Sequence, residues 1–194
     1  MKESNLADFF LVGGTALSLQ IGHRISIDID LFSLNPFDES GMLAYLESEK
    51  GFKLDYLNKN TIKGEIGRTK IDLITHSYPL VKQLELANGI RLASLEDIAA
   101  MKLNAIVGNG TRLKDFVDVA FLSCYLSLGQ MMDAYEYKYS SRNPVLTLKA
   151  LLYHNDINFE EPIQLIGTTY SWKVIKKRLD EMAKSPSKIF ESLF

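Results

Sequence analysis

The chain has 194 residues, of which 46% are hydrophobic and 24% charged, and its formal net charge is -2. This composition indicates a globular protein with one core or two small ones; it excludes a disordered chain and the overall basic field of a general nucleic-acid binder. The single cysteine, Cys124, excludes a disulfide framework, and we expect it in the core. The N-terminus lacks the apolar region of a signal peptide, and no apolar run approaches the ~20 residues of a membrane span, so we expect a cytoplasmic protein without membrane contact.

The first expected elements are a strand, a glycine turn and a short helix. Apolar residues 9–12 lead directly into Gly13 and Gly14, and residues 15–21 are typical of a short apolar helix. Glycines at this point would let the backbone approach a phosphate, with the N–H groups of the helix start pointing at it. Gly13 and Gly14 are therefore candidates for a phosphate-binding turn, although a glycine pair after a strand is most often only a tight turn.

A second strand is expected at residues 25–32, and it carries two carboxylates. Strand alternation places Asp28 and Asp30 on the same face, about 7 Å apart. Two carboxylates at this spacing repel each other, and a divalent cation between them relieves the repulsion, as in two-metal phosphoryl transfer. The alternative is a charged surface without a metal. Thirteen residues separate Gly14 from Asp28, enough for one helix and a return strand that bring the turn and the carboxylates to one end of a small sheet.

The run GGTALSLQIGHRISIDIDLF at residues 13–32 resembles the first motif of the nucleotidyltransferase superfamily with the DNA polymerase β-like fold. More specifically, it resembles the AbiEii/AbiGii toxin family of bacterial toxin-antitoxin and phage-abortive systems. The likeness continues through IDLI at 71–74, AAMKLNAI at 99–106 and RLKDFVDVAFL at 112–122, and it is loose beyond them.

The resemblance implies an α+β protein. A polymerase β-like nucleotidyltransferase domain with a small mixed sheet is expected at residues 1–92, and a C-terminal helical bundle that completes the nucleotide cleft is expected at 93–194. The resemblance also implies Mg²⁺ or Mn²⁺ as cofactor, a nucleoside triphosphate (NTP) as substrate, and an antitoxin encoded nearby as partner.

A third carboxylate is expected in a hairpin in the middle of the chain. The pattern predicts a helix at 42–49, a strand beginning at 52–56, and hairpin strands at 61–66 and 70–75. Asp72 alternates with apolar neighbours in the second hairpin strand. In the fold that the chain resembles, a third acid on a neighbouring strand helps to bind metal or acts as the base on the incoming hydroxyl. The alternative is an ordinary surface aspartate.

From Ser94 the apolar residues recur with the period of a helix, and we expect Ser94 and Asp97 to form a capping box at its start. On a helical wheel Lys102 falls at the centre of an apolar stripe, where an unpaired charge would cost several kcal/mol. Asp118 is likewise enclosed by apolar residues, and Asp115 lies one turn earlier on the same helical side. We expect Lys102 to pair with Asp118 or Asp115.

The resemblance implies that Lys102 binds the nucleotide phosphates and that Asp118 orients this lysine. Arg24 could bind a phosphate bidentately. His23 beside it, mostly neutral at an unperturbed pKa of ~6.5, is a weaker candidate. Superfamily members carry Gly-Ser in the turn, whereas here Gly14 is followed by Thr15, which leaves the hydroxyl contact to Thr15 or Ser18. The candidate catalytic residues are Asp28, Asp30, Asp72, Lys102 and Asp118; the candidate metal ligands are Asp28, Asp30 and Asp72; and the candidate nucleotide-binding residues are Gly13, Gly14, Thr15, Arg24, Ser26, Lys102, Arg112, Lys114 and Asp115.

The C-terminal part is expected to be helical, at 119–128, 131–139, 145–153 and 172–182. Residues 171–188 contain six cations and two anions, and the pattern favours a solvated amphipathic helix over an RNA-contacting patch. Helix packing is favoured over base stacking for four tyrosines: Tyr135, Tyr137, Tyr139 and Tyr153.

The leading hypothesis is a metal-dependent nucleotidyltransferase toxin that transfers a nucleotide from an NTP to an RNA, such as tRNA, or to another acceptor. Two alternatives remain open. The first is adenylyl transfer to a small molecule such as an aminoglycoside, and the second is an inactive relative of the fold that acts as a binding module.

Overall fold

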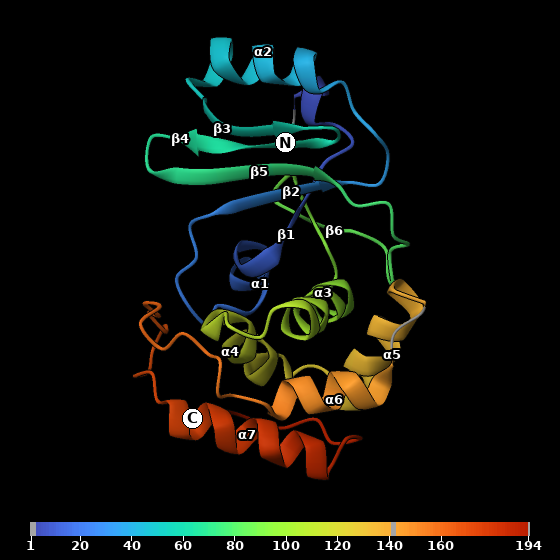
Figure 1. Ribbon diagram of the computed structural model, residues 1–194, viewed down its shortest axis with the longest axis vertical. Coiled ribbons are helices and arrows are strands. Elements are labelled where there is room, and N and C mark those ends of the chain that lie inside the picture. Colours follow the sequence, from blue (N-terminus) through green and yellow to red (C-terminus); the bar gives the residue numbers. More distant parts are fainter. Residues whose placement is uncertain (1–2, 141–142, 194) are drawn as a thin grey trace.

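The computed structural model of the protein describes residues 3–140 and 143–193 and shows an α+β fold (Figure 1), as predicted. Seven strands form one mixed sheet in the order β3-β4-β5-β2-β1-β7-β6. The strands are β1 (Phe10–Val12), β2 (Ile29–Ser33), β3 (Lys53–Asn58), β4 (Thr61–Ile66), β5 (Thr69–Thr75), β6 (Glu85–Ala87) and β7 (Ile90–Leu92). The helices are α1 (Gly13–Ile21), α2 (Glu39–Lys50), α3 (Leu95–Gly108), α4 (Leu113–Leu122), α5 (Leu128–Lys138), α6 (Pro144–Leu152) and α7 (Trp172–Lys184), after a short 3-10 helix at Ser4–Leu6.

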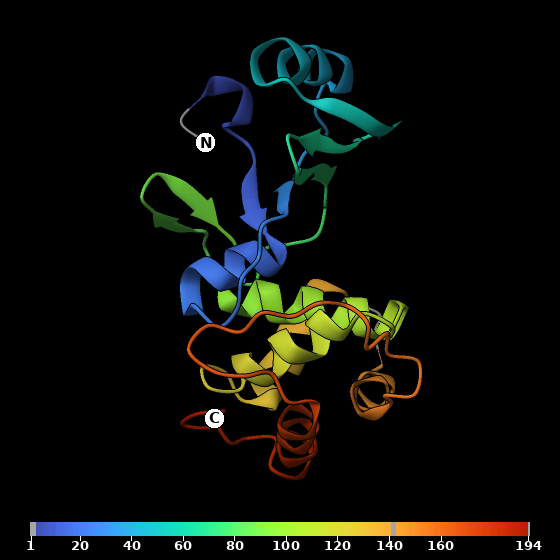
Figure 2. The ribbon, with the colours of Figure 1, turned by 90° about the vertical axis from the view of Figure 1, so that its left-hand side faces the viewer.

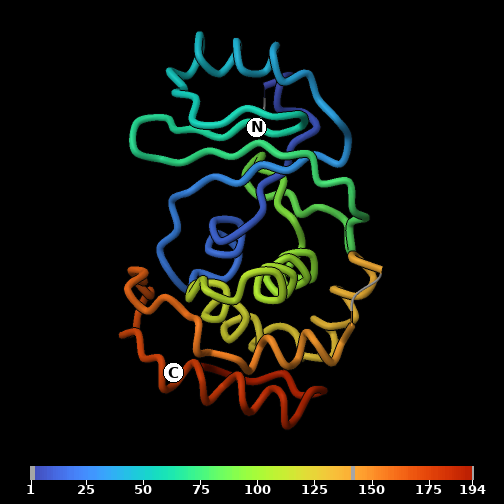
Figure 3. The backbone as a smooth tube through the Cα atoms, in the orientation of Figure 1, coloured from blue at the N-terminus to red at the C-terminus, as the bar shows by residue number. Residues whose placement is uncertain are grey.

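The sheet and the C-terminal helices occupy opposite halves of the molecule. In the tube of Figure 3 the chain builds the upper half first, with α2 at its outer end, and then turns into the helices of the lower half. Helix α1 lies between the sheet and helices α3 and α4 (Figure 1). The mixed sheet and the C-terminal helices predicted from the sequence are thus confirmed. The division into domains at residues 92 and 93 stays a prediction.

The pairing of the central strands brings the predicted carboxylates together. Strand β2 runs antiparallel to β1, with Val12 opposite Asp30, and parallel to β5, with Asp30 opposite Asp72. Gly13 follows Val12 directly and opens α1. The glycine turn and the aspartates of two neighbouring strands therefore lie at one place in the sheet.

The strand predicted at residues 25–32 is shorter than expected, because β2 begins only at Ile29. The preceding residues pair elsewhere: Arg24 forms an isolated bridge with Leu165, and the backbone N–H of Ile25 donates to the carbonyl of Gln164 at 2.9 Å. Asp28 thus lies in the loop before β2 rather than within the strand. Helix α1 also begins earlier than predicted, at Gly13.

A hairpin that was not predicted, β6–β7, extends the sheet beyond β1, with Leu92 of β7 opposite Leu11 of β1. Its turn residues, Asn88 and Gly89, have φ angles of 53° and 79°. Asn-Gly is the commonest dipeptide of a type I′ hairpin turn, because both of its residues accept positive φ. This signal was present in the sequence.

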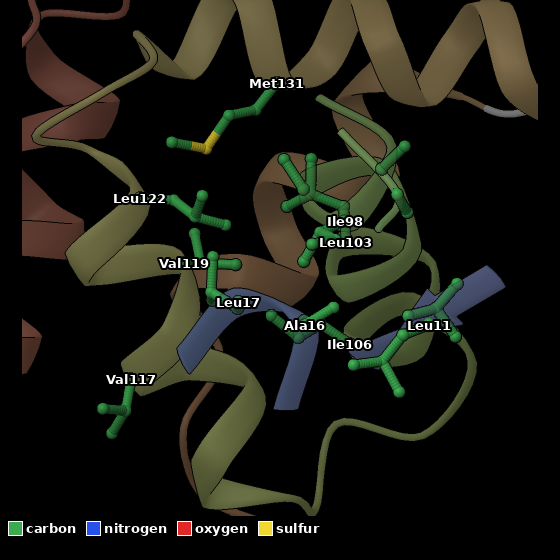
Figure 4. Close-up of a cluster of buried hydrophobic side chains, with 14 of the residues drawn as sticks. Leu11, Ala16, Leu17, Ile98, Leu103, Ile106, Val117, Val119, Leu122 and Met131 are labelled. Carbon is green, nitrogen blue, oxygen red and sulfur yellow. The ribbon is translucent and has the colours of Figure 1, made fainter. Parts of the chain in front are cut away.

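One cluster of buried apolar side chains joins the sheet to the helices. Figure 4 shows Leu11 of β1, Leu17 of α1 and Met131 of α5 among its members, and none of the three is more than 5% exposed. Helix α1 is therefore held from both sides, which fixes the glycine turn at its first residues.

The C-terminal helices differ from the predictions in several details. The helix expected at 119–128 is the end of α4 followed by a turn, and α5 begins after a capping box formed by Ser127 and Gln130. Tyr135 and Tyr139 are buried as expected, whereas Tyr137 and Tyr153 are 59% and 51% exposed. None of the helices within residues 3–140 and 143–193 has the length and apolar character needed to cross a membrane.

The predicted amphipathic helix at 172–182 is α7, and it buries one apolar face. Arg178, counted among the cations of this segment, lies on the buried face: it donates to Ser123 Oγ at 2.9 Å, and its guanidinium lies 4.4 Å from the ring centroid of Phe190. Cys124, expected in the core, is only half-buried, with its Sγ 3.6 Å from Arg178 Nη1. Arg178 is therefore a packing residue and not part of a surface patch.

Candidate active site

A cleft of about 850 Å³ lies between the sheet and helices α3 and α4. Its walls come from the β1–α1 turn, the loop before β2, strand β2, helices α3 and α4, and residues 161–164. The candidate site residues that line it are Gly13, Gly14, Arg24, Ser26, Asp28, Asp30, Lys102, Arg112, Lys114 and Asp115; Thr15, Asp72 and Asp118 lie outside the lining.

The glycine turn is packed against two charged side chains of the site. A Cβ atom on Gly13, whose φ is +71°, would lie 2.3 Å from Asp30 Oδ2, and one on Gly14 would lie 2.2 Å from Arg24 Nη2. The positive φ of Gly13 also favours glycine, whereas a side chain at Gly14 would have to displace the guanidinium of Arg24. In this structure a carboxylate and a guanidinium pack against the turn, and the phosphate contact predicted for Gly13 and Gly14 stays a prediction.

Replacing Gly14 by alanine is expected to lower the free energy of unfolding by about 1–3 kcal/mol, because the new methyl group would displace Arg24. The matched control is Gly108→Ala in α3, where a Cβ meets no atom of the described residues within 4 Å. There alanine should be neutral or stabilising, since it is the better helix former. Urea unfolding of both variants measures the difference, and equal stabilities would contradict the packing role of Gly14.

The carboxylate of Asp30 lies in an unfavourable electrostatic setting. Burial raises its pKa, and the nearby charges of Asp72 and Asp28 raise it further, against the opposing effect of Lys102 and Arg112. Asp72 is paired with the ammonium of Lys63 on the neighbouring strand β4. The described residues contain no group of three or more His, Cys, Asp or Glu side chains placed to hold a metal ion together. The oxygen donors of Asp28 and Asp30 on the cleft wall are nonetheless the chemistry that Mg²⁺ prefers, and a divalent cation would relieve their repulsion.

A buried ionic cluster adjoins the cleft. Asp118, which is fully buried, accepts hydrogen bonds from Arg24 Nε at 2.6 Å and Arg24 Nη2 at 2.9 Å, and lies 2.8 Å from both His23 Nε2 and Lys102 Nζ. Lys102 Nζ also donates to Asp115 Oδ1 at 2.6 Å. The predicted pairing of Lys102 is confirmed, and it involves both aspartates.

The charges in this cluster stabilise one another. Burial alone would lower the pKa of Lys102, but the attraction of Asp118 and Asp115 outweighs burial and raises it. Burial likewise opposes the charge of Asp118, yet Lys102 and the hydrogen bonds from Arg24 and His23 hold its pKa well below the ordinary value. Lys102 is therefore a fixed positive charge on the cleft wall.

Arg24 and His23 also belong to this cluster, and their membership was not predicted. The guanidinium of Arg24 spans both oxygens of Asp118 and also donates to the carbonyl of Ile25 at 3.2 Å. The phosphate contact predicted for Arg24 stays a prediction. No sequence signal pointed to its pairing, because Arg24 and Asp118 are 94 positions apart.

The hydroxyl groups predicted near the phosphate hold the loop before β2. Thr15 Oγ1 donates to the carbonyl of Asp28 and lies 3.0 Å from Ser26 Oγ, and Ser18 Oγ donates to the carbonyl of Arg24. These bonds fasten residues 24–28 to α1. The positions of Arg24 and Asp28 in the cleft thus depend on the helix that begins at the glycine turn.

Residues 158–166, here called the crossing segment, join the two halves of the site and were not predicted. The segment runs across the face of the molecule shown in Figure 2, in orange. The N–H of Asn158 donates to the carbonyl of Thr111 at 2.8 Å, and the N–H of Ile166 donates to the carbonyl of His23 at 3.0 Å. Glu161 of the segment lies 3.2 Å from Lys114 Nζ. The crossing segment therefore closes the end of the cleft that holds Arg24, Arg112 and Lys114, here called the cationic end.

Comparison with known proteins gives a consistent picture. The model of the family described as "Nucleotidyl transferase AbiEii toxin, Type IV TA system" matches residues 2–73 and 49–187. An uncharacterized protein of Aquifex aeolicus is 33% identical over 159 residues, which cover 79% of this chain and 77% of that protein.

Two solved structures from Helicobacter pylori share the fold. One, a protein proposed to be a nucleotidyltransferase, has a TM-score of 0.58 at 19% identity, with 93% of this chain and 87% of that chain covered. The other, JHP933, has a TM-score of 0.54 at 17% identity and covers 93% of this chain and 84% of that one. At these identities the structural likeness shows the fold alone.

Proposed function

The chain belongs to the AbiEii nucleotidyltransferase toxin family, and on this premise we propose that it transfers a nucleotide from an NTP to an RNA, such as tRNA, or to another cellular acceptor. The observation that supports this most is the meeting of opposite charges in one cleft. Asp28 and Asp30 line one wall, and Lys102, held by Asp115 and Asp118, lines the other.

We assign the residues as follows. Asp28 and Asp30 would hold Mg²⁺ or Mn²⁺, which when bound supplies Lewis-acid stabilisation of the charge that develops on the phosphates. Lys102 and the cationic end would bind the triphosphate. The network of Asp118 and Asp115 keeps Lys102 charged and in place before the substrate arrives, so no reorganisation is needed during the reaction.

The reaction forms one P–O bond and breaks another. The acceptor hydroxyl attacks the α-phosphorus, the bond to the β-phosphate breaks, and pyrophosphate leaves from the cationic end. Asp72 would take the proton of the acceptor hydroxyl, from its place beside Asp30 in the sheet register.

Incubation of the protein with each labelled NTP, Mg²⁺ and total bacterial RNA tests this proposal, with Asp30→Asn as the inactive control. Label that enters RNA and requires Asp30 supports it. Label that enters only a small molecule would favour adenylyl transfer to such an acceptor. No Asp30-dependent label in either fraction would overturn nucleotidyl transfer and favour a binding module.

Expression of the wild-type chain alone is expected to arrest bacterial growth, and Asp28→Ala is expected to abolish the arrest, because a carboxylate of the cleft is lost. Asp55→Ala, at an exposed position of β3 outside the cleft, is the matched control and should remain toxic. Growth curves at expression levels matched by blotting measure the effect. Since the family is one of toxin-antitoxin systems, we propose that an antitoxin encoded nearby restores growth. A harmless wild-type chain, or a toxic Asp28→Ala variant, would contradict this proposal.

A further inference from the structure

Three aromatic side chains line the cleft away from its cationic end. They are Phe32 of β2, His76 just after β5, and Tyr139 just after α5. The ring of His76 stacks on Phe32 with centroids 4.8 Å apart and an interplanar angle of 29°. Tyr139 Oη lies 3.2 Å from His76 Nε2. We call these three residues the aromatic end of the cleft.

The position of the aromatic end relative to the carboxylates follows from the sheet. Phe32 lies two residues after Asp30 on β2, so both side chains leave the same face, about 7 Å apart. The antiparallel pairing of β1 and β2 puts Val12, next to the glycine turn, opposite Asp30, and Phe10 opposite Phe32. Movement along β2 therefore leads from the glycine turn past Asp30 to the aromatic end.

The order of the cationic end, Asp30 and the aromatic end along the cleft matches the order of the triphosphate, ribose and base in a nucleotide. With the triphosphate at the cationic end and the α-phosphate at Asp30, the next part of an NTP along the cleft is its ribose, and the base comes after it. The step of about 7 Å from Asp30 to Phe32 leaves room for the ribose.

The chemistry of the aromatic end also suits a base. Aromatic rings stack on the π-face of any nucleobase. His76 is neutral at pH 7, because burial and the charge of Lys138 lower its pKa to about 4. A neutral imidazole can stack on a base, and its Nε2 is already within hydrogen-bond distance of Tyr139 Oη. Met101, which also lines the cleft, adds a polarizable apolar contact.

We propose that Phe32, His76 and Tyr139 form a nucleobase-binding subsite, which rests on the function proposed above. The base of the incoming NTP is the occupant that the order of the cleft favours. A base at the end of an RNA acceptor has the same chemistry, and the experiment separates the two.

The test compares two probes that differ only in the base. Calorimetric titration in the presence of Mg²⁺ measures the affinity of the 194-residue chain for each NTP and for ribose 5-triphosphate, which has no base. For the wild-type chain we expect at least one NTP to bind about 5- to 150-fold more tightly than ribose 5-triphosphate, the range that stacking of one base contributes.

Phe32→Leu removes the aromatic face and keeps an apolar side chain, and His76→Leu is a second variant in case the first fails to fold. Each is expected to remove most of the preference for NTP and to leave the affinity for ribose 5-triphosphate unchanged. The matched control is Tyr153→Leu, at a half-exposed aromatic residue just after α6 and outside the cleft, which should change neither affinity.

Unchanged NTP binding combined with an at least 5-fold higher KM for total bacterial RNA in the labelling assay would assign the subsite to the acceptor base. Unchanged binding and unchanged KM in the folded variants would overturn the subsite, as would an equal loss of affinity for both probes, which indicates a structural role. The subsite would also be overturned, and the proposed function left standing, by a combination of two results. The wild-type chain would bind ribose 5-triphosphate as tightly as every NTP, and the variants would have the same KM for RNA as the wild-type chain. A wild-type chain that binds neither probe would overturn both.

Discussion

Replacing Asp118 by asparagine is expected to lower the free energy of unfolding by about 3–5 kcal/mol, because the change leaves two cations buried without their shared counter-charge. Asp118 is fully buried and is the common partner of Arg24, Lys102 and His23. Asparagine keeps the shape of the side chain, so the loss reports on charge. Urea unfolding followed by circular dichroism measures it, and Asp133→Asn, at an exposed position of α5, is the control with an expected change within about 0.5 kcal/mol.

Lys102→Met should destabilise the protein less than Asp118→Asn does. Without Lys102, Asp118 still has Arg24 and His23, and the carboxylate of Asp115 has Arg112 at 3.9 Å. Adding Asp118→Asn to Lys102→Met should cost less than it costs in the wild-type chain, because the two residues are in direct contact. Additive losses would contradict the ionic cluster.

The contribution of Asp118 to the free energy of unfolding is expected to fall as the pH is lowered. Because Asp118 has a depressed pKa in the folded protein, its contribution is present above the unfolded-state pKa of about 3.9 and is lost as the pH falls toward the folded-state pKa. The stability gap between the wild type and Asp118→Asn should therefore narrow below about pH 4. A constant gap down to pH 2 would mean that the carboxylate charge is not what stabilises the cluster.

The pairing of Lys102 could be predicted because its signal is local. A lysine at the centre of an apolar helical stripe and an aspartate enclosed by apolar residues each require a partner, and the two helices are adjacent in the chain. Arg24 carries no such signal. Its bond to Asp118 depends on how the loop before β2 meets α4, which only the folded chain specifies.

The start of β2 was predicted wrongly because apolar and polar side chains alternate along residues 25–32 in the same way whether the segment pairs with a strand or with a loop. Residues 24 and 25 pair with the crossing segment instead, and Ile25 and Ile27 remain 48% and 61% exposed. Residues 158–166 have no helical or strand period, so their contribution to the site could not be predicted from the sequence.

Replacing Asp30 by asparagine is expected to reduce nucleotidyl transfer at least about 100-fold while the melting temperature of the protein stays the same or rises. The loss of activity follows from removing a metal-binding carboxylate. The unchanged or higher stability follows from electrostatics: the raised pKa of Asp30 means that its ionised form is disfavoured in the folded state by burial and by Asp72 and Asp28. A group with a raised pKa stabilises the fold below its unfolded-state pKa and loses that contribution as the pH rises through the folded-state value, so at pH 7 the charge on Asp30 is a cost that asparagine removes.

Titration with Mg²⁺ or Mn²⁺ in the presence and absence of NTP gives an independent readout. The wild-type chain should bind the metal more strongly with NTP, whose phosphates complete the ligand set, and its melting temperature should rise with metal concentration. Asp30→Asn should lose both the binding signal and the thermal shift, whereas Asp55→Asn, at an exposed position on β3, should keep them. A lower melting temperature for Asp30→Asn without metal would mean that this carboxylate supports the fold. Undiminished metal binding by that variant would remove Asp30 from the proposed metal site.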